Sequence, residues 1–168
     1  MQIIDIVDQL PQHPSKRYKL RNSSDIRQIV VHHSATKPIS VDGRADAEAF
    51  ARYHVQTHGW PGIGYDYVIG ANGTVYKTNR NNAVNYHAGN ANKISLGICL
   101  AGNFDLGEPP AEQWQAAVEL ARILMVAYRV PVERVIGHRE VPAAKSCPGA
   151  HFDMDQFRRE VKSRANSR

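Results

Sequence analysis

Residues 136–149 restrict the fold of this chain most, because they place three chemically reactive side chains in a segment that cannot be regular. Its glycines and prolines exclude a continuous helix or strand. Within the segment lie His138, Lys145 and Cys147. A metal ion would fix such a loop, since zinc takes imidazole nitrogen and cysteine thiolate in tetrahedral sites. The alternative is a solvated loop with a buried free cysteine.

A second stretch favours the metal. Residues 29–34 are a β-branched apolar run that ends in His32 and His33. Because side chains alternate between the two faces of a strand, one histidine can enter a site while the other packs or hydrogen-bonds behind it. His32, His138 and Cys147 would then make a three-ligand zinc site with an open fourth position, which suits a hydrolase.

Strand and helix patterns alternate along the chain, which predicts an α/β (α+β) single domain with one mixed central sheet flanked by helices. Asn72-Gly73 between strand-like residues predicts a type I′ hairpin. Cys99, in a buried-strand pattern, is expected to be a core or groove-floor residue rather than a ligand or a disulfide partner. Asp153 is expected to cap the last helix. Strands are expected at residues 3–7, 29–32, 65–69, 74–76 and 95–100, and helices at 46–57, about 110–128 and after 153.

The charge pattern points to no specific partner. Lysine and arginine exceed aspartate and glutamate by 21 to 16, and basic residues cluster at 16–21 and 158–168. Such clusters can bind nucleic acid or an anionic polymer. Because no RNA-binding or helix-turn-helix signature accompanies them, we expect two solvated basic segments and no nucleic-acid partner. No apolar run is long enough to insert into a membrane, and the first residues lack the pattern of a signal peptide.

Six short motifs occur in the order and approximate spacing of a known family. They are His32–Thr36, Gly64–Ile69, His87–Gly89, Ser95–Ile98, Gly137–Glu140 and Lys145–Pro148. One such motif alone would be weak, but six in order are specific. On these motifs the chain resembles the zinc-dependent N-acetylmuramoyl-L-alanine amidases of the phage-lysozyme and peptidoglycan-recognition-protein type, over residues from about 26 to 157.

The resemblance implies a zinc ion, one per chain, at the floor of a surface groove. The zinc ligands that it implies are His32, His138 and Cys147, the same three that the residue types suggest. The implied catalytic residues beside the metal are Tyr65 and Lys145, and the implied substrate-groove positions are His87 and Asn92.

Two departures place the chain within this family. Its cell-wall recycling amidases use aspartate as the third ligand, where this chain has Cys147. Some of them also carry a glutamate, proposed as a base, where this chain has Cys99, which cannot do the same work. The chain is therefore more similar to the phage-lysozyme and recognition-protein branch.

The expected function is hydrolysis of the amide between the lactyl group of N-acetylmuramic acid and L-alanine, as in a phage or prophage endolysin. We expect a monomeric hydrolase with bacterial peptidoglycan as its partner, made in the cytoplasm and reaching the wall through a membrane lesion. Residues 1–25 would form an N-terminal wrap and residues 26–165 the catalytic core, without a separate wall-binding domain. The alternatives are a non-catalytic peptidoglycan-recognition module and a cytoplasmic cell-wall recycling amidase.

Overall fold

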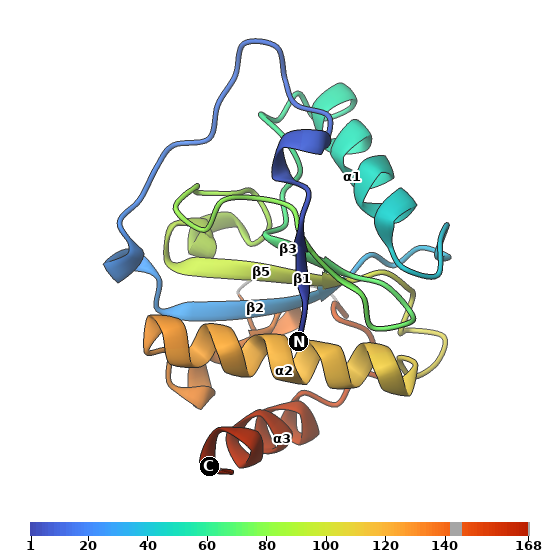
Figure 1. Ribbon diagram of the computed structural model, residues 1–168, viewed down its shortest axis with the longest axis vertical. Coiled ribbons are helices and arrows are strands. Elements are labelled where there is room, and N and C mark those ends of the chain that lie inside the picture. Colours follow the sequence, from blue (N-terminus) through green and yellow to red (C-terminus); the bar gives the residue numbers. More distant parts are fainter. Residues whose placement is uncertain (142–145, 168) are drawn as a thin grey trace.

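A six-stranded mixed sheet with the order β1-β4-β3-β5-β2-β6 lies at the centre of the fold (Figure 1). The computed structural model describes residues 1–141 and 146–167. Strands β3 and β4 are antiparallel, and the other neighbouring strands are parallel. This mixed sheet confirms the fold class expected from the sequence. The strands are β1 (Ile3–Asp5), β2 (Gln28–His33), β3 (Tyr67–Ile69), β4 (Val75–Lys77), β5 (Ser95–Leu100) and β6 (Val135–Gly137).

In the described part of the chain, α-helices lie on both sides of the sheet (Figure 1). Helices α2 (Ala111–Tyr128) and α3 (Met154–Asn166) lie on one side and α1 (Arg44–Gln56) lies on the other. The side chain of Asp153 accepts a hydrogen bond from the backbone N–H of Gln156, which confirms the expected cap of α3. None of the helices in the described part of the chain has the length and hydrophobicity that crossing a bilayer requires.

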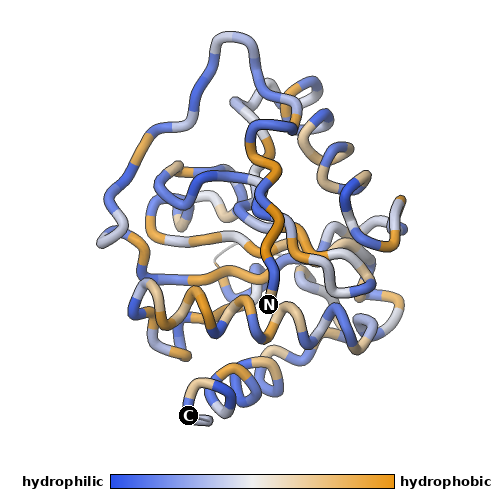
Figure 2. Tube along the Cα trace, viewed as in Figure 1, coloured by the Kyte–Doolittle hydropathy of each residue, from blue (hydrophilic) through white to orange (hydrophobic). Residues whose placement is uncertain are grey.

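The alternating residues of β5 explain why one face of the sheet is core and the other can hold a site. Its large aliphatic residues, Leu96, Ile98 and Leu100, pack in the core formed with α2 and α3. Its small residues, Ser95, Gly97 and Cys99, point to the opposite face. Figure 2 shows the hydrophobic residues gathered along the sheet and in stripes on α2. The small side chains leave room for rings to lie against the second face of the sheet.

The β3–β4 hairpin forms as predicted, but its turn is not of type I′. A type I′ turn needs positive φ at both central residues. Gly73 has φ of +85°, whereas Asn72 does not share the left-handed conformation. The N–H of Gly73 instead bonds to the carbonyl of Gly70, and the side chain of Asn72 accepts from the N–H of Thr74. Residues 70–74 therefore form a wider connection than the asparagine–glycine pair alone predicts.

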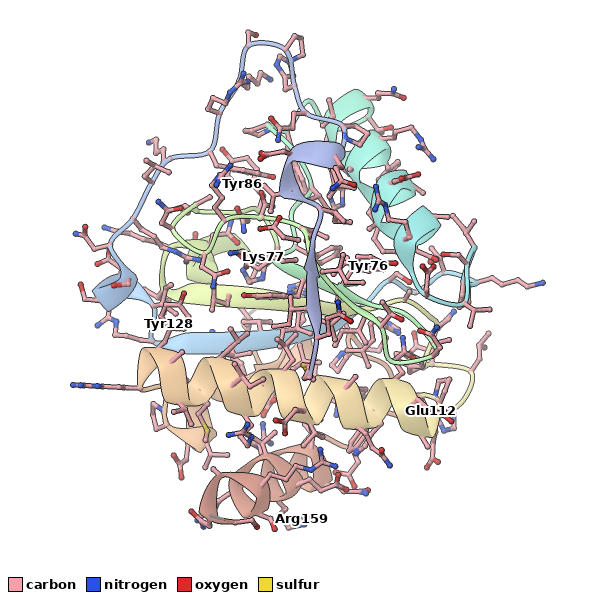
Figure 3. The ribbon with its side chains drawn as sticks, in the orientation of Figure 1. Tyr76, Lys77, Tyr86, Glu112, Tyr128 and Arg159 are labelled. Atoms are coloured by element: carbon pink, nitrogen blue, oxygen red, sulfur yellow. The ribbon has the colours of Figure 1, made fainter. Side chains whose placement is uncertain are left out.

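The two basic segments lie on the outside of the fold. Of residues 1–25, expected to form a wrap, Ile3–Asp5 instead joins the sheet as β1, and from here on the N-terminal wrap means residues 10–22, which run as an extended loop outside the sheet (Figure 1). At the other end of the chain, Arg159 points outward from α3 (Figure 3). Lys16, Arg17 and Lys19 are exposed, as expected for a solvated segment, but Arg21 at the end of the first basic cluster is buried, so that part of the prediction is wrong.

Candidate metal centre

Three side chains from distant parts of the sequence converge at one point of the molecule. His32 lies near the end of β2, His138 directly follows β6, and Cys147 lies in the loop before α3. The carboxyl ends of β2 and β6 meet because the two strands are parallel neighbours. One ligand atom from each of the three residues lies within 4.8 Å of the other two. Among the described residues, this is the one group of histidine, cysteine and acidic side chains spaced for a metal ion.

The donor set and spacing fit zinc. Tetrahedral zinc, with bonds of about 2.0–2.3 Å, separates its ligand atoms by about 3.4–3.6 Å, and Nδ1 of His32 lies 3.7 Å from Sγ of Cys147. Burial lowers the pKa of His32 and of His138, so both imidazoles are neutral and can offer a lone pair. Burial raises the pKa of the Cys147 thiol to about 11, so the thiolate that zinc binds needs a nearby cation.

The loop that carries Cys147 is held from two sides. The backbone N–H of Arg139 donates to the carbonyl of Cys147 at 2.6 Å, and its guanidinium donates to the carbonyls of Gly149 and Phe152. On the other side, the Asp105 carboxylate accepts from Ala150 N–H at 2.9 Å and from the Ser146 hydroxyl at 3.0 Å. The hydrogen bond from the Ala150 N–H contributes most to lowering the pKa of the Asp105 carboxyl.

Glu140 fixes the turn that presents His138. Its carboxylate accepts a 2.7 Å hydrogen bond from the backbone N–H of Gly137 and forms a 2.9 Å ion pair with Arg158 of α3. The 3₁₀ turn η5 (His138–Glu140) is thereby closed against the end of β6. Glu140 thus acts on the backbone beside the candidate ligand.

The second histidine of β2 points away from the candidate ligands, as strand alternation predicts. Nδ1 of His33 accepts a 3.0 Å hydrogen bond from the backbone N–H of Phe104. This bond ties β2 to the segment that follows β5. His32 therefore lies at the candidate metal position, whereas the ring of His33, a residue that also lines the groove, bonds to the backbone of Phe104.

Tyr65 lies beside the candidate ligands, just before β3. The centroid of its ring is 5.3 Å from that of His32. Burial raises its pKa well above the ordinary value, and the neighbouring Cys99 and Cys147 raise it further, so the phenol keeps its proton at neutral pH. The second predicted catalytic residue, Lys145, lies outside the described residues.

An open groove of about 700 Å³ contains the candidate metal position. His32, Tyr65 and Cys147 line it, together with His87 and Asn90 on its wall. The His87 ring is largely buried, and its Nδ1 lies 3.0 Å from Nε2 of His32. Of the two predicted substrate residues, His87 therefore lies at the groove and contacts a candidate ligand.

Asn92, the other predicted substrate residue, organises the groove wall from within. Its side-chain oxygen accepts hydrogen bonds from the backbone N–H groups of His87 and Ala88, at 3.0 and 2.7 Å. This arrangement closes the 3₁₀ segment η3 (Gly89–Ile94) onto the residues before it. A direct contact between Asn92 and substrate stays a prediction.

The N-terminal wrap supports the same wall from behind. Arg21, which is buried, donates hydrogen bonds to the carbonyls of Asn81, Asn92, Lys93 and Ser95. Beside it along the wall, Tyr86 packs edge-on against Tyr18 of the wrap, with 4.9 Å between ring centroids. Figure 3 shows Tyr86 between the wrap and the sheet.

Sequence reasoning missed the supporting residues Asp105, Arg139 and Arg21. Each acts mainly through main-chain groups that lie outside its own local segment, so no local spacing indicates its role. Arg139 alone had a signal, because it lies inside the Gly137–Glu140 motif, next to His138.

The fold and the site together define an α/β protein with an open groove on one face of its sheet, lined by three side chains that are spaced to hold a metal ion. The family model for N-acetylmuramoyl-L-alanine amidase matches residues 22–150. This chain belongs to the N-acetylmuramoyl-L-alanine amidase family.

Similar proteins include both lytic enzymes and recognition proteins. The endolysin of Escherichia phage T7 is 34% identical over 144 residues, covering 84% of this chain and 89% of the relative. Peptidoglycan-recognition protein SC1a of Drosophila melanogaster is 30% identical over 126 residues, covering 73% of this chain and 68% of the relative. The solved structure of the Ph2119 endolysin, from a Thermus scotoductus bacteriophage, superposes with a TM-score of 0.76 at 28% identity, covering 95% of this chain and 99% of the other.

Proposed function

We propose that this chain is a zinc-dependent endolysin that hydrolyses the amide joining the lactyl group of N-acetylmuramic acid to L-alanine in peptidoglycan. The observation that carries the proposal is the open three-ligand site of His32, His138 and Cys147 in the groove. Structural zinc sites are closed by four protein ligands, whereas catalytic sites keep one position for water or substrate. Within the described residues the group offers three ligands.

The residues around the metal position suit attack on an amide carbonyl. Zinc, when bound, lowers the pKa of its water to about 7 and polarises the carbonyl. The proton that Tyr65 retains lets its hydroxyl donate a hydrogen bond to the oxygen on which negative charge develops. Lys145, two residues before the ligand Cys147, is proposed to add a positive charge there.

The groove is large enough for a substrate that combines sugar and peptide. Its volume of about 700 Å³ lies within the roughly 300–1,000 Å³ of ligand-binding clefts. We propose that the wall formed by His87 and its neighbours faces the peptidoglycan strand. The T7 endolysin relative, and Cys147 where recycling amidases use aspartate, favour a lytic role over a recycling one.

A recognition module that holds peptidoglycan without cutting it is the competing function, because recognition proteins are among the relatives. Loss of a zinc ligand, often the cysteine, is typical of such modules. This chain retains Cys147 and Tyr65, which favours the enzyme.

Incubation of the protein with purified bacterial wall tests the proposal. An amidase releases new N-terminal L-alanine amines, loses this activity on chelation and regains it with added zinc. Metal analysis of the same preparation should find one zinc per chain. Wall pull-down without amine release would identify a recognition module, and neither binding nor release would overturn both functions.

A further inference from the structure

The two ring nitrogens of His32 face different partners. Nδ1 lies 3.7 Å from the sulfur of Cys147, on the side of the candidate metal. Nε2 lies 3.0 Å from Nδ1 of His87, a hydrogen-bonding distance. The candidate metal position and His87 therefore lie by different nitrogens of one imidazole, which is almost fully buried, with 1% of its surface exposed.

A chain of hydrogen bonds continues from His87 into the groove wall. Nε2 of His87 lies 3.3 Å from the hydroxyl oxygen of Ser95. That hydroxyl donates to the carbonyl of Ala91 at 2.6 Å. Since a carbonyl can only accept, the hydroxyl proton is committed to Ala91, and the Ser95 oxygen is left to accept from His87.

These roles fix every proton once a metal occupies Nδ1 of His32. Nε2 of His32 must then carry its proton and donate it to Nδ1 of His87. His87 carries its own proton on Nε2 and donates it to Ser95. One consistent direction runs from His32 through His87 and Ser95 to the backbone of Ala91.

We infer that His87 is a positioning residue of the metal centre, which orients His32 so that Nδ1 points at the zinc, with Ser95 fixing the His87 tautomer. This inference rests on the proposed zinc-dependent function and goes beyond the groove-lining role that the resemblance implies. An acceptor on the remote nitrogen holds a metal-bound histidine in orientation and makes it a stronger ligand.

The His87 ring packs directly against the backbone of Gly97 in β5, where any residue larger than glycine would collide with it. A Cβ at Gly97 would lie 2.7 Å from Cγ and 2.8 Å from Nδ1 of the His87 ring, closer than real Cβ contacts come. Any side chain at position 97 would push the ring away from His32. In addition, the backbone N–H of His87 donates a hydrogen bond to the side-chain oxygen of Asn92. The ring is thus limited by the backbone of Gly97 on one side, while Asn92 fixes the main chain that carries it.

Zinc affinity, measured without substrate by competition with a chelator of known affinity, tests this role. His87→Phe keeps a ring but removes the acceptor, so its dissociation constant for zinc should rise by roughly 10–100-fold. His87→Asn offers an oxygen near the position of Nδ1 and should recover most of the affinity. His58→Phe is the matched control, because His58 is exposed on the surface and should leave zinc affinity unchanged.

Two further variants keep the test decisive if His87→Phe folds poorly. Gly97→Ala retains both His87 nitrogens but displaces the ring, and should also weaken zinc binding by roughly 10-fold or more. Ser95→Ala removes only the distal acceptor and should cause a smaller loss, of about 3–10-fold. Circular dichroism and unfolding of the zinc-free proteins separate these effects from misfolding.

The outcomes distinguish this inference from the proposed function. If the wild-type protein binds zinc and its affinity is unchanged in His87→Phe, Gly97→Ala and Ser95→Ala, the role of His87 is overturned but the proposed function is not. Unchanged zinc affinity with lost wall binding in His87→Phe would make His87 a substrate residue instead. A wild-type chain that binds no zinc would overturn both the role of His87 and the zinc-dependent function.

Discussion

Nδ1 of His54 accepts a 2.9 Å hydrogen bond from the backbone N–H of Gly64, the residue before Tyr65. Helix α1 thereby holds the backbone that places the proposed catalytic tyrosine. Burial lowers the pKa of His54 to about 4, with a smaller contribution from nearby His58. Protonation of Nδ1 would remove the acceptor, so this contact requires the neutral imidazole.

The first prediction is a loss of stability in acid that depends on His54. The folded-state pKa of about 4 lies below the unfolded value of 6.5, so the unfolded chain binds the proton more readily between these pH values. The stabilisation is therefore complete above about pH 6.5 and is lost as the pH falls towards 4. It amounts to about 3 kcal/mol.

Denaturant unfolding at pH 7 and pH 4.5 checks this prediction. Wild type should lose about 2–3 kcal/mol more than His54→Gln between the two pH values. His58→Gln, which changes an exposed histidine of the same region, should keep most of the wild-type loss, because His58 makes the smaller contribution to the shift. Parallel pH profiles for wild type and His54→Gln would contradict the prediction.

The second prediction concerns the two cysteines as a matched pair. Cys147→Ala should lose most of its zinc and its amidase activity, because it removes one of three ligands. Cys99→Ala should keep its zinc, since Cys99 is a fully buried residue of β5 outside the three-ligand group. Elemental analysis of both variants decides the assignment, and full zinc occupancy in Cys147→Ala would refute it.

Free thiols give a third prediction. Both cysteines are unpaired in the structure, and each has a role that a disulfide would prevent. Thiol counting on denatured, chelator-treated protein without reductant should find two free thiols per chain. A freshly purified monomer with none would show that both roles are wrong.

The fourth prediction separates catalysis from metal binding. Tyr65→Phe should stay folded and zinc-loaded and should still bind wall fragments, but kcat should fall by about 10²–10³, because the lost hydroxyl acts on the transition state. Tyr67→Phe is the matched control, since its hydroxyl bonds to Asn81 and its loss should leave kcat near wild type.

Lys145→Ala should behave as Tyr65→Phe does, with zinc retained and kcat reduced by about 10²–10³. Zinc content, wall pull-down and amine release should be measured on the same preparations. Wild-type turnover in Lys145→Ala would remove this lysine from the mechanism, and zinc loss in Tyr65→Phe would make the role of Tyr65 structural.

Sequence patterns predicted those strands and helices whose formation depends on the residues within them. The bounds of β5 at Ser95–Leu100 agree with the sequence prediction, because a strand buried on both faces reads as a nearly continuous run. The strand expected from residue 65 begins instead at Tyr67. Residues 65 and 66 serve tertiary contacts, such as the hydrogen bond from Gly97 N–H to the Asp66 carboxylate, and these have no local signature.

In the candidate site as well, some residues could be predicted from the sequence and others could not. Residue type and motif order pointed to His32, His138 and Cys147, which the structure brings together. The contact between His87 and His32 could not be predicted, because it depends on the missing side chain of Gly97 on a neighbouring strand. Asp105 could not be found either, since it reaches across to a loop more than 40 residues later in the chain.

The four carbonyls that Arg21 holds have a practical consequence for anyone who shortens this protein. Truncation past residue 21 removes no residue that lines the groove. It does, however, remove the Arg21 hydrogen bonds that hold the backbone near His87. A trimmed variant also lacks the edge strand β1, and loosening of the segment that carries His87 should weaken its binding of both the metal and peptidoglycan. The boundary chosen at the N-terminus therefore affects the site, although the residues removed lie outside the groove.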